Sequence, residues 1–194
     1  MKQEQIILPN WLQNKFIVLI GLMGAGKTRL GRILAESLKL PFIDTDIEIE
    51  KAAGITIEEI FNNFGETYFR NGEQKVINRV LNGEPSILAT GGGAFMNSVT
   101  RKKIEKFGVS IWLRADINLL VKRTESRSGR PLLKNGNRRE ILSKLMKERY
   151  PVYSEANIIF NISDEPASVT AKKLIEILNT TKSVHKRSDV NNYG

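Results

Sequence analysis

The sequence of 194 residues contains no cysteine and a single histidine, His185. The lack of cysteine excludes disulfides, a thiolate nucleophile and a cysteine-ligated metal centre. His185 lies in a polar stretch near the C-terminus, where a catalytic histidine or a histidine-rich metal site is not expected. Any acid–base chemistry is therefore expected to come from carboxylates.

Long hydrophobic runs are also missing. The longest, residues 16–25, is interrupted by glycines and is too short to span a bilayer. Residues 1–8 contain Glu4 and only a short apolar run, which does not match a secretory signal. We therefore expect a cytoplasmic protein with no membrane partner. The chain length and the 41% hydrophobic content fit one domain of ordinary size.

The net charge is strongly positive, at +9, but it is unevenly distributed. Residues 122–149 carry ten lysines and arginines against three glutamates, which accounts for most of the excess. A triphosphate and a second anionic substrate would explain such a segment. Because the sequence has no basic stripe rich in aromatic residues, we expect small anionic ligands and no nucleic-acid partner.

Residues 21–28, Gly-Leu-Met-Gly-Ala-Gly-Lys-Thr, match the phosphate-binding pattern G-x-x-x-x-G-K-[ST]. A predicted strand at residues 16–20 precedes the match, and apolar residues at helical spacing follow it. In this arrangement backbone N–H groups and a helix N-terminus hold phosphates. Lys27 reaches the β- and γ-phosphates, and the Thr28 hydroxyl can bind Mg²⁺. A glycine-rich turn without a ligand would not need all these parts, so the sequence predicts a nucleoside triphosphate site.

Predicted strands and helices alternate along the chain. The strands are expected at residues 16–20, 42–46, 86–89, 109–113 and 158–162. The helices are expected at residues 27–39, 47–53, 65–81, 98–108, 116–124, 138–149 and 167–178, and a further short helix is expected to begin after Thr56. Thr56 and Glu59 form a capping box for the short helix, and Ser98 caps the helix at 98–108. This alternation predicts an α/β fold with three layers, in which helices cover both faces of a five-stranded parallel sheet.

Three segments are expected to lie outside this regular core. Residues 1–14 form an N-terminal extension, with Trp11 and Leu12 packed on the domain of residues 15–179. Residues 125–137 are polar and contain glycine and proline, which predicts a mobile loop. Residues 180–194 form a polar tail that we expect to be disordered.

Asp44 and Asp46 follow the second predicted strand, at the edge of the sheet where parallel strands end and ligands bind. Period-two alternation would send both carboxylates to one side. One of them can hold Mg²⁺ through water while the other orients a hydroxyl nucleophile. Alternatively, Asp46 only caps the next helix. Because capping would explain one aspartate and not two, a functional pair is favoured.

Four further features have both a functional and a structural interpretation. Residues 91–93, Gly-Gly-Gly, either expose backbone to a closely approaching ligand or form a flexible turn. Arg70 and Glu73 lie three residues apart on a predicted helix, a spacing that usually marks a solvated surface pair. Arg130, in the predicted loop, could stabilise charge on a transferring phosphoryl group or only add solubility. Arg149 could bind an anion or cap its helix.

Taken together, these segments resemble the shikimate kinase family over about residues 15–178. The matching segments are residues 21–28, Asp44 to Asp46, Phe69-Arg70 with Glu73, residues 91–93, residues 130–133, and Arg149 before Pro151 and Tyr153. The resemblance implies a P-loop kinase fold like that of nucleoside-monophosphate kinases, with a substrate-binding region at about 46–82 and a lid at about 125–137. It implies that a monomeric enzyme transfers the γ-phosphoryl group of ATP to the 3-hydroxyl of shikimate, in aromatic amino-acid biosynthesis.

The same resemblance implies roles for individual residues. Lys27, Asp46 and Arg130 are implied to be catalytic, with Lys27 and Arg130 on the moving phosphoryl group. Arg70 and Arg149 are implied to bind the shikimate carboxylate. The full set of substrate contacts is Asp46, Arg70, Gly91, Gly92, Gly93 and Arg149, and Thr28 and Asp44 serve Mg²⁺. The residues expected to bind ATP are Gly24, Ala25, Gly26, Lys27, Thr28, Arg29, Arg123, Arg130 and Pro166.

Two departures and two other functions stay open from the sequence. Arg29 stands where the family usually has a small hydroxyl residue, and Gly72 can loosen the helix that carries Arg70. A gluconate kinase would not explain two carboxylate-binding arginines together with the triple glycine. A nucleotide-switched regulator or nucleic-acid-binding ATPase is disfavoured because the sequence lacks an Asn-Lys-x-Asp guanine signature.

Overall fold

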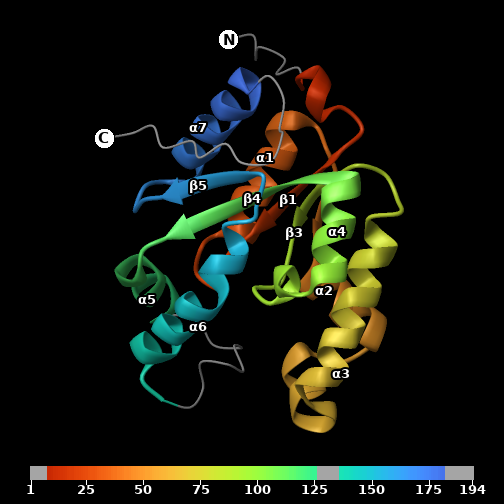
Figure 1. Ribbon diagram of the computed structural model, residues 1–194, viewed down its shortest axis with the longest axis vertical. Coiled ribbons are helices and arrows are strands. Elements are labelled where there is room, and N and C mark those ends of the chain that lie inside the picture. The colour runs from red at the N-terminus through yellow and green to blue at the C-terminus, as the bar shows by residue number, and fades with distance from the viewer. Residues whose placement is uncertain (1–7, 126–135, 182–194) are drawn as a thin grey trace.

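A five-stranded sheet, in which all neighbouring strands run parallel, forms the centre of the protein (Figure 1). The computed structural model describes residues 8–125 and 136–181. The strand order is β2-β3-β1-β4-β5, with the bounds Phe42–Asp44 (β2), Ile87–Ala89 (β3), Phe16–Ile20 (β1), Gly108–Ala115 (β4) and Ile158–Ile162 (β5). Every residue of β1, the central strand, is buried, which fits an apolar strand covered on both faces.

Helices cover both faces of the sheet. Their bounds are α1 Lys27–Leu38, α2 Thr45–Ala53, α3 Ile57–Val80, α4 Ser98–Phe107, α5 Ile117–Glu125, α6 Arg138–Tyr153 and α7 Ala167–Thr180, with single-turn helices η1 at Asn10–Leu12 and η2 at Ala94–Met96. α1 and α7 pack together on one face, whereas α4 packs against β1 and β4 on the other, with α6 on the same side (Figure 1). The predicted three-layer α/β fold is confirmed. Within the described part of the chain, no helix is long and apolar enough to cross a membrane.

Several local predictions are confirmed. The capping box at the start of α3 is present, since Thr56 Oγ1 accepts from the Glu59 N–H at 3.2 Å and Glu59 Oε2 accepts from the Thr56 N–H at 2.8 Å. Leu12 is buried, and Trp11 packs against the core. The predicted break between two helices at residue 65 is also present, because Gly65 adopts a non-helical φ of 79° and ψ of 175° that interrupts the helical backbone within α3.

Two predicted boundaries are wrong, and side-chain caps explain both. The second strand ends at Asp44 and not at residue 46, because the Asp44 side chain accepts a hydrogen bond from the Asp46 N–H and so caps α2. Asp46 therefore lies in the first turn of a helix. Asn97 caps α4 in place of Ser98. Its Oδ1 accepts hydrogen bonds from the N–H groups of Val99 and Thr100, which have no partner within the helix.

α6 runs past its predicted end at Arg149 and continues through Pro151 to Tyr153. A proline removes one backbone donor, which α6 tolerates here close to its C-terminal end. Arg149 is consequently inside the helix, with only 8% of its surface exposed, so the interpretation of Arg149 as an exposed helix cap is wrong. The predicted lid, with Arg130, and the predicted tail fall largely on residues 126–135 and 182–194, outside the described residues.

A second, smaller group of buried residues lies apart from the main core, between α2 and α3. It consists of Ile49, Ile60, Phe69 and Val76. These apolar contacts hold α2 and α3 together at the carboxyl end of the sheet, within the region predicted to bind substrate. Figure 1 shows α3 extending along one side of the molecule, away from the sheet.

Candidate active site

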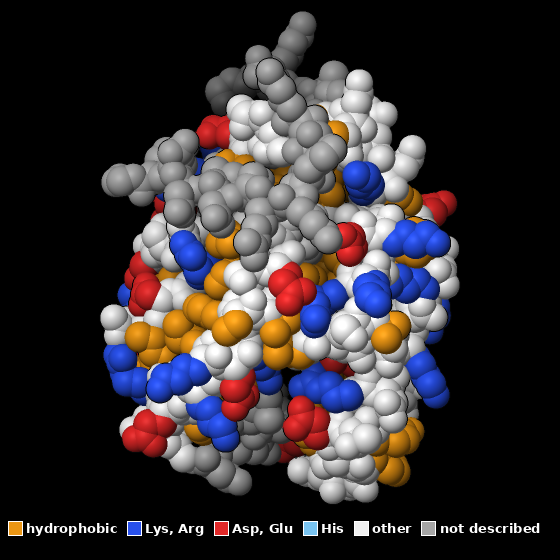
Figure 2. Space-filling view, viewed as in Figure 1, with side chains coloured by type: hydrophobic (Ala, Val, Ile, Leu, Met, Phe, Trp, Pro, Cys, Tyr) orange, Lys and Arg blue, Asp and Glu red, His pale blue; other side chains and the backbone are white. Residues whose placement is uncertain are grey.

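A cleft of about 770 Å³ opens at the carboxyl ends of the strands. Its walls come from the phosphate loop, the start of α2, the inner side of α3, the glycines after β3, Arg149 of α6 and the turn between β5 and α7. Figure 2 shows the lower half of the molecule hollowed between acidic and basic side chains. The predicted site residues that line the cleft are Gly24, Ala25, Gly26, Lys27, Thr28, Arg29, Asp44, Asp46, Arg70, Gly91, Gly92, Gly93, Arg123 and Arg149.

The phosphate loop has the backbone conformation that a bound anion requires. Gly24 and Gly26 adopt φ angles of 88° and 93°, which side chains rarely allow, and α1 begins directly after them at Lys27. The helix N-terminus therefore points into the cleft with its unpaired N–H groups. Lys27 Nζ folds back over the loop and donates to the carbonyls of Gly21 at 2.8 Å and Leu22 at 3.1 Å.

Next to the loop, the Thr28 hydroxyl and the Asp44 carboxylate are joined by a hydrogen bond and form a pair of oxygens that could hold a metal ion. Thr28 Oγ1 donates to Asp44 Oδ2 at 2.8 Å, and Asp44 Oδ1 accepts from the Asp46 N–H at 3.1 Å. Asp44 thus fixes both the hydroxyl of α1 and the first turn of α2. Both aspartates line the cleft, but Asp44 accepts a hydrogen bond on each carboxylate oxygen, from the Thr28 hydroxyl and the Asp46 N–H.

The carboxyl of Asp46 is electrostatically perturbed. Burial, followed by the negative charge of Asp44, raises its pKa from 3.8 to about 6, while the charge of Lys27 acts in the opposite direction. A carboxylate in this range accepts a proton more readily than an ordinary aspartate does at neutral pH. Perturbation of this kind in a cleft is typical of functional residues.

Charged side chains pack closely against the triple glycine, so that an added side chain at Gly91 or Gly93 would have to displace one of them. A Cβ on Gly91 would overlap Glu73 Oε1 and would lie 2.9 Å from Asp46 Oδ1. A Cβ on Gly93 would overlap the guanidinium of Arg70. The segment is therefore not a flexible turn but a place where three charged side chains approach bare backbone.

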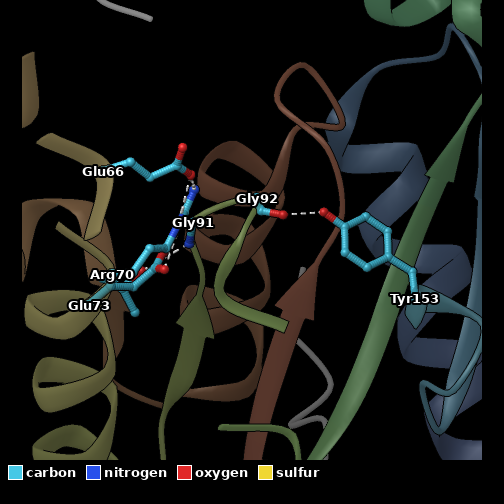
Figure 3. A network of polar contacts seen from close by, with 7 residues as sticks. Glu66, Arg70, Glu73, Gly91, Gly92 and Tyr153 are labelled. Carbon is cyan, nitrogen blue, oxygen red and sulfur yellow. Dashed lines mark hydrogen bonds and ion pairs between the residues drawn. The ribbon is translucent and has the colours of Figure 1, made fainter. Parts of the chain in front are cut away.

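Arg70 is held between two carboxylates (Figure 3). Its Nη1 donates to Glu73 Oε2 at 2.7 Å, and its Nη2 donates to Glu66 Oε1 at 3.0 Å. Glu73 is only 3% exposed, and burial raises the pKa of its carboxyl although the charge of Arg70 opposes the rise. The interpretation of Arg70 and Glu73 as a solvated surface pair is therefore wrong. Within the described part of the chain, the buried Glu73 Oε1 has no hydrogen-bond partner.

Arg149 enters the cleft from the opposite side. Its Nη1 lies 3.2 Å from the position that a Cβ on Gly92 would occupy. Arg70 and Arg149 thus reach the same glycine segment from α3 and α6, two elements that are far apart in the sequence. The sequence predicted this convergence through the resemblance alone.

Of the two remaining predicted ATP residues in the described segments, Arg123 lines the cleft beside the phosphate loop. Arg123 Nη1 is 3.7 Å from the position of a Cβ on Gly26, and Arg123 Nη2 donates to the Ser163 carbonyl at 3.1 Å. Pro166, the N-cap of α7, is the only predicted site residue in the described segments that does not line the cleft. Its neighbours Asp164 and Glu165 line it instead.

Comparisons with known proteins point to one family. A family model described as shikimate kinase matches residues 23–179. The shikimate kinase of Paramagnetospirillum magneticum is 52% identical over 170 residues, which cover 88% of this chain and 87% of that protein. The shikimate kinase of Brucella canis is 48% identical over 167 residues, which cover 86% and 84%. The chain belongs to the shikimate kinase family.

Solved structures resemble this chain more closely when they are shikimate kinases than when the structure is a gluconokinase, the alternative considered from the sequence. The shikimate kinase of Acinetobacter baumannii, solved in complex with shikimate, matches with a TM-score of 0.84 at 36% identity and covers 88% of this chain and 96% of that one. A gluconokinase of Sinorhizobium meliloti reaches a TM-score of 0.53 at 17% identity, with 86% and 92% covered. The gluconokinase therefore shares the fold alone.

Two residues that support this family's site were missed in the sequence. Thr45 is fully buried, and its hydroxyl accepts from the Gly91 N–H at 3.0 Å, which fixes the glycine segment to α2. Glu66 holds the outer side of Arg70. Glu66 precedes Arg70 by four residues, a helical pair spacing that could have revealed it. Thr45 lies within the matching segment Asp44 to Asp46, but no sequence pattern indicated its hydrogen bond to Gly91, which lies in the turn after β3.

Proposed function

We propose that this protein transfers the γ-phosphoryl group of ATP to the 3-hydroxyl of shikimate, forming shikimate 3-phosphate for aromatic amino-acid biosynthesis. The observation that carries the proposal is a single cleft in which a phosphate loop adjoins a second subsite with two arginines and a buried carboxylate. The phosphate loop accounts for the nucleotide. The second subsite accounts for an acceptor that has both a carboxylate and hydroxyls, as shikimate does.

The nucleotide end of the cleft binds and orients the triphosphate. The N–H groups at the start of α1 and the ammonium of Lys27 stabilise negative charge on the β- and γ-phosphates. The carbonyls of Gly21 and Leu22 hold the ammonium above the loop, so little reorganisation accompanies the transfer. Arg123 lies over the same loop, at the end where the nucleotide base would bind. Arg130 stays a prediction from the resemblance, as a second cation on the transferred group.

Magnesium fits the pair formed by Thr28 and Asp44, whose oxygens are 2.8 Å apart. Among the residues that the structure describes, no group of three or more His, Cys, Asp or Glu side chains could hold a metal. Mg²⁺ usually binds one or two carboxylates together with substrate phosphates, so Thr28 and Asp44 would hold it against the nucleotide. Bound there, it would neutralise charge on the phosphate oxygens.

At the acceptor end, Asp46 orients the attacking hydroxyl and accepts its proton. Its pKa of about 6 suits this role, since the carboxylate is ionised at neutral pH yet more basic than usual. The unpartnered Glu73 Oε1 offers a second buried acceptor for a ring hydroxyl. Arg70 and Arg149 bind the carboxylate through charge-assisted hydrogen bonds.

We expect kcat/KM for shikimate to be constant above neutral pH and to fall about tenfold per pH unit below about pH 6, because protonated Asp46 cannot accept a proton. The measurement is the pH dependence of kcat/KM at saturating ATP and Mg²⁺. Removing the charge of Asp44, as in Asp44→Asn, should move the midpoint to lower pH. Glu73 also has a raised pKa, so a control must show which carboxyl causes the loss of activity at low pH. If Asp46 causes it, the residual activity of Asp46→Asn should no longer fall below about pH 6. If the activity of that variant still falls at low pH, another carboxyl group is responsible for the pH dependence.

Gly91→Ala should lower kcat/KM for shikimate by about 10²-fold, because the added methyl group overlaps Glu73 and pushes Asp46 from its position. Steady-state kinetics with shikimate measures the effect. Gly83→Ala is a matched control, since its Cβ would meet only the Val80 carbonyl, at 3.3 Å, outside the cleft. Equal activities of the two variants would show that the close approach at Gly91 has no functional role.

Arg70→Met and Arg149→Met should each raise KM for shikimate roughly 10- to 150-fold, since a hydrogen bond to a charged group contributes about 1.5–3 kcal/mol. Lysine should not rescue either site, because a point charge cannot replace the planar guanidinium. The discriminating measurement compares shikimate with its carboxamide analogue. The wild-type enzyme should reject the amide strongly, and both methionine variants should discriminate much less. An arginine whose variant keeps the wild-type preference does not bind the carboxylate.

The proposed function is tested by ADP release with shikimate, gluconate and nucleoside monophosphates side by side. We expect turnover with shikimate and at most trace activity with the others. A preference for gluconate or for a nucleotide would overturn the proposal. A monomeric state and a cytoplasmic location are further predictions, which size-exclusion chromatography and cell fractionation can check.

A further inference from the structure

Tyr153, the last residue of α6, connects this helix to the glycine segment after β3. Its side chain is completely buried, and its hydroxyl donates a hydrogen bond to the Gly92 carbonyl (Figure 3). This bond joins residues 61 positions apart in the sequence. It is therefore a tertiary contact between the helix that carries Arg149 and the backbone that lines the cleft.

The same hydroxyl interacts with Arg149, which lies one helical turn earlier on the same side of α6. Burial raises the pKa of Tyr153 to about 12, while the charge of Arg149 and a side-chain hydrogen bond with it oppose the rise. Tyr153 thus keeps its proton at neutral pH and remains a donor to Gly92. The hydroxyl lies between a guanidinium and a carbonyl that both belong to the acceptor subsite.

The ring of Tyr153 is held independently of its hydroxyl. It makes edge-on contacts with Trp112, at 5.8 Å between centroids, and with Phe95, at 6.5 Å. A phenylalanine ring would keep both contacts. The oxygen is therefore not needed to place the ring, and its two polar contacts point to a separate role.

We propose that Tyr153 is a positioning residue for the acceptor, whose hydroxyl fixes the Gly92 peptide and the Arg149 guanidinium relative to each other. Tyr153 does not line the cleft itself, so it acts through these two residues. The inference rests on the proposed function, in which Gly92 and Arg149 contact shikimate. Groups that are already ordered bind a ligand more tightly, because the ligand does not have to order them.

Tyr150, one turn earlier in α6, provides a matched control. Its hydroxyl donates to the Ala115 carbonyl at 2.6 Å, and its ring makes an edge-on contact with Trp112 at 4.7 Å. Burial also raises its pKa to about 12. Neither Tyr150 nor Ala115 lines the cleft. Tyr150→Phe therefore removes the same kind of hydrogen bond from the same helix without touching the acceptor subsite.

The experiment compares Tyr153→Phe with Tyr150→Phe by thermal unfolding and by steady-state kinetics with each substrate varied. We expect similar, modest losses of Tm. Tyr153→Phe should raise KM for shikimate roughly 3- to 10-fold, the range for one hydrogen bond, with KM for ATP unchanged. Tyr150→Phe should leave both KM values within about twofold. In an Arg149→Met background, Tyr153→Phe should add little, because the two residues act as one unit.

A wild-type KM for shikimate in Tyr153→Phe, or an equal rise in Tyr150→Phe, would overturn the positioning role while leaving the proposed function intact. A Tyr153→Phe protein that fails to fold would also overturn it, because the hydroxyl would then serve stability. If the wild-type protein shows no turnover of shikimate, both the proposed function and this inference are wrong.

Discussion

Asp46→Asn is expected to lower kcat by about 10²- to 10⁴-fold, the usual contribution of a positioned general base. Asparagine keeps the size of the side chain but cannot accept the proton of the attacking hydroxyl. Because the proposed main binding charge for the shikimate carboxylate comes from Arg70 and Arg149 and not from Asp46, KM for shikimate should change much less than kcat. Single-turnover and steady-state kinetics at pH 8, where wild-type Asp46 is ionised, measure this effect.

Asp44→Asn is the matched control. Asp44 lies only two positions before Asp46, and its side chain accepts a hydrogen bond from the Asp46 N–H. The main effect of Asp44→Asn should be weaker Mg²⁺ binding, seen as a higher Mg²⁺ concentration for half-maximal activity, because Asp44 pairs with Thr28 at the proposed metal position. The two variants should therefore give different Mg²⁺ titrations. Identical titrations would show that the roles of Asp44 and Asp46 are assigned wrongly.

Lys27→Met should lower kcat by at least about 10²- to 10³-fold, the loss seen when one preorganised charged donor is removed from a transition state. The ammonium donates to two loop carbonyls, of Gly21 and Leu22, next to the proposed position of the phosphates. The fold should persist, since methionine can fill the same volume without a charge. ADP release and far-UV circular dichroism measure the two properties.

Arg32→Met is the control for Lys27→Met, because it removes an equal charge from the same helix. Arg32 is exposed, its guanidinium lies 5.8 Å from the ring centroid of Phe42, and it does not line the cleft. Its activity should stay near that of the wild type. A Lys27→Met enzyme with near-normal kcat would contradict the assignment of the phosphate loop.

The sequence predicted the parts of this structure that depend on local order. The phosphate loop, β1 and β5 have short-range signatures, namely glycine spacing and apolar runs. The wrong boundaries, at the end of β2 and the start of α4, arose where a side chain caps a helix by accepting hydrogen bonds from its first N–H groups. The sequence places Thr45 and Asp46 in the strand because they follow apolar residues, yet the carboxylate of Asp44 caps a helix that begins at Thr45.

The acceptor subsite was less predictable, because it depends on contacts between distant segments. The Arg70–Glu73 spacing fits a surface pair, and only packing of α3 against the glycine segment reveals that Glu73 is buried. Likewise, nothing local marks Thr45 or Tyr153 as partners of residues 91 and 92. The resemblance gave roles to the two arginines, whereas Glu73 and Tyr153 appeared in its matching segments without a role.

The most direct test of the account is the NMR analysis of the product formed from ATP, Mg²⁺ and shikimate. We predict one ADP for each phosphorylated shikimate and a phosphorus coupling to the proton on C3, since Asp46 is proposed to present the 3-hydroxyl to the phosphate loop. Arg70→Met and Arg149→Met should form the same product more slowly. Phosphate on another hydroxyl, or no shikimate-dependent ADP at all, would contradict the account.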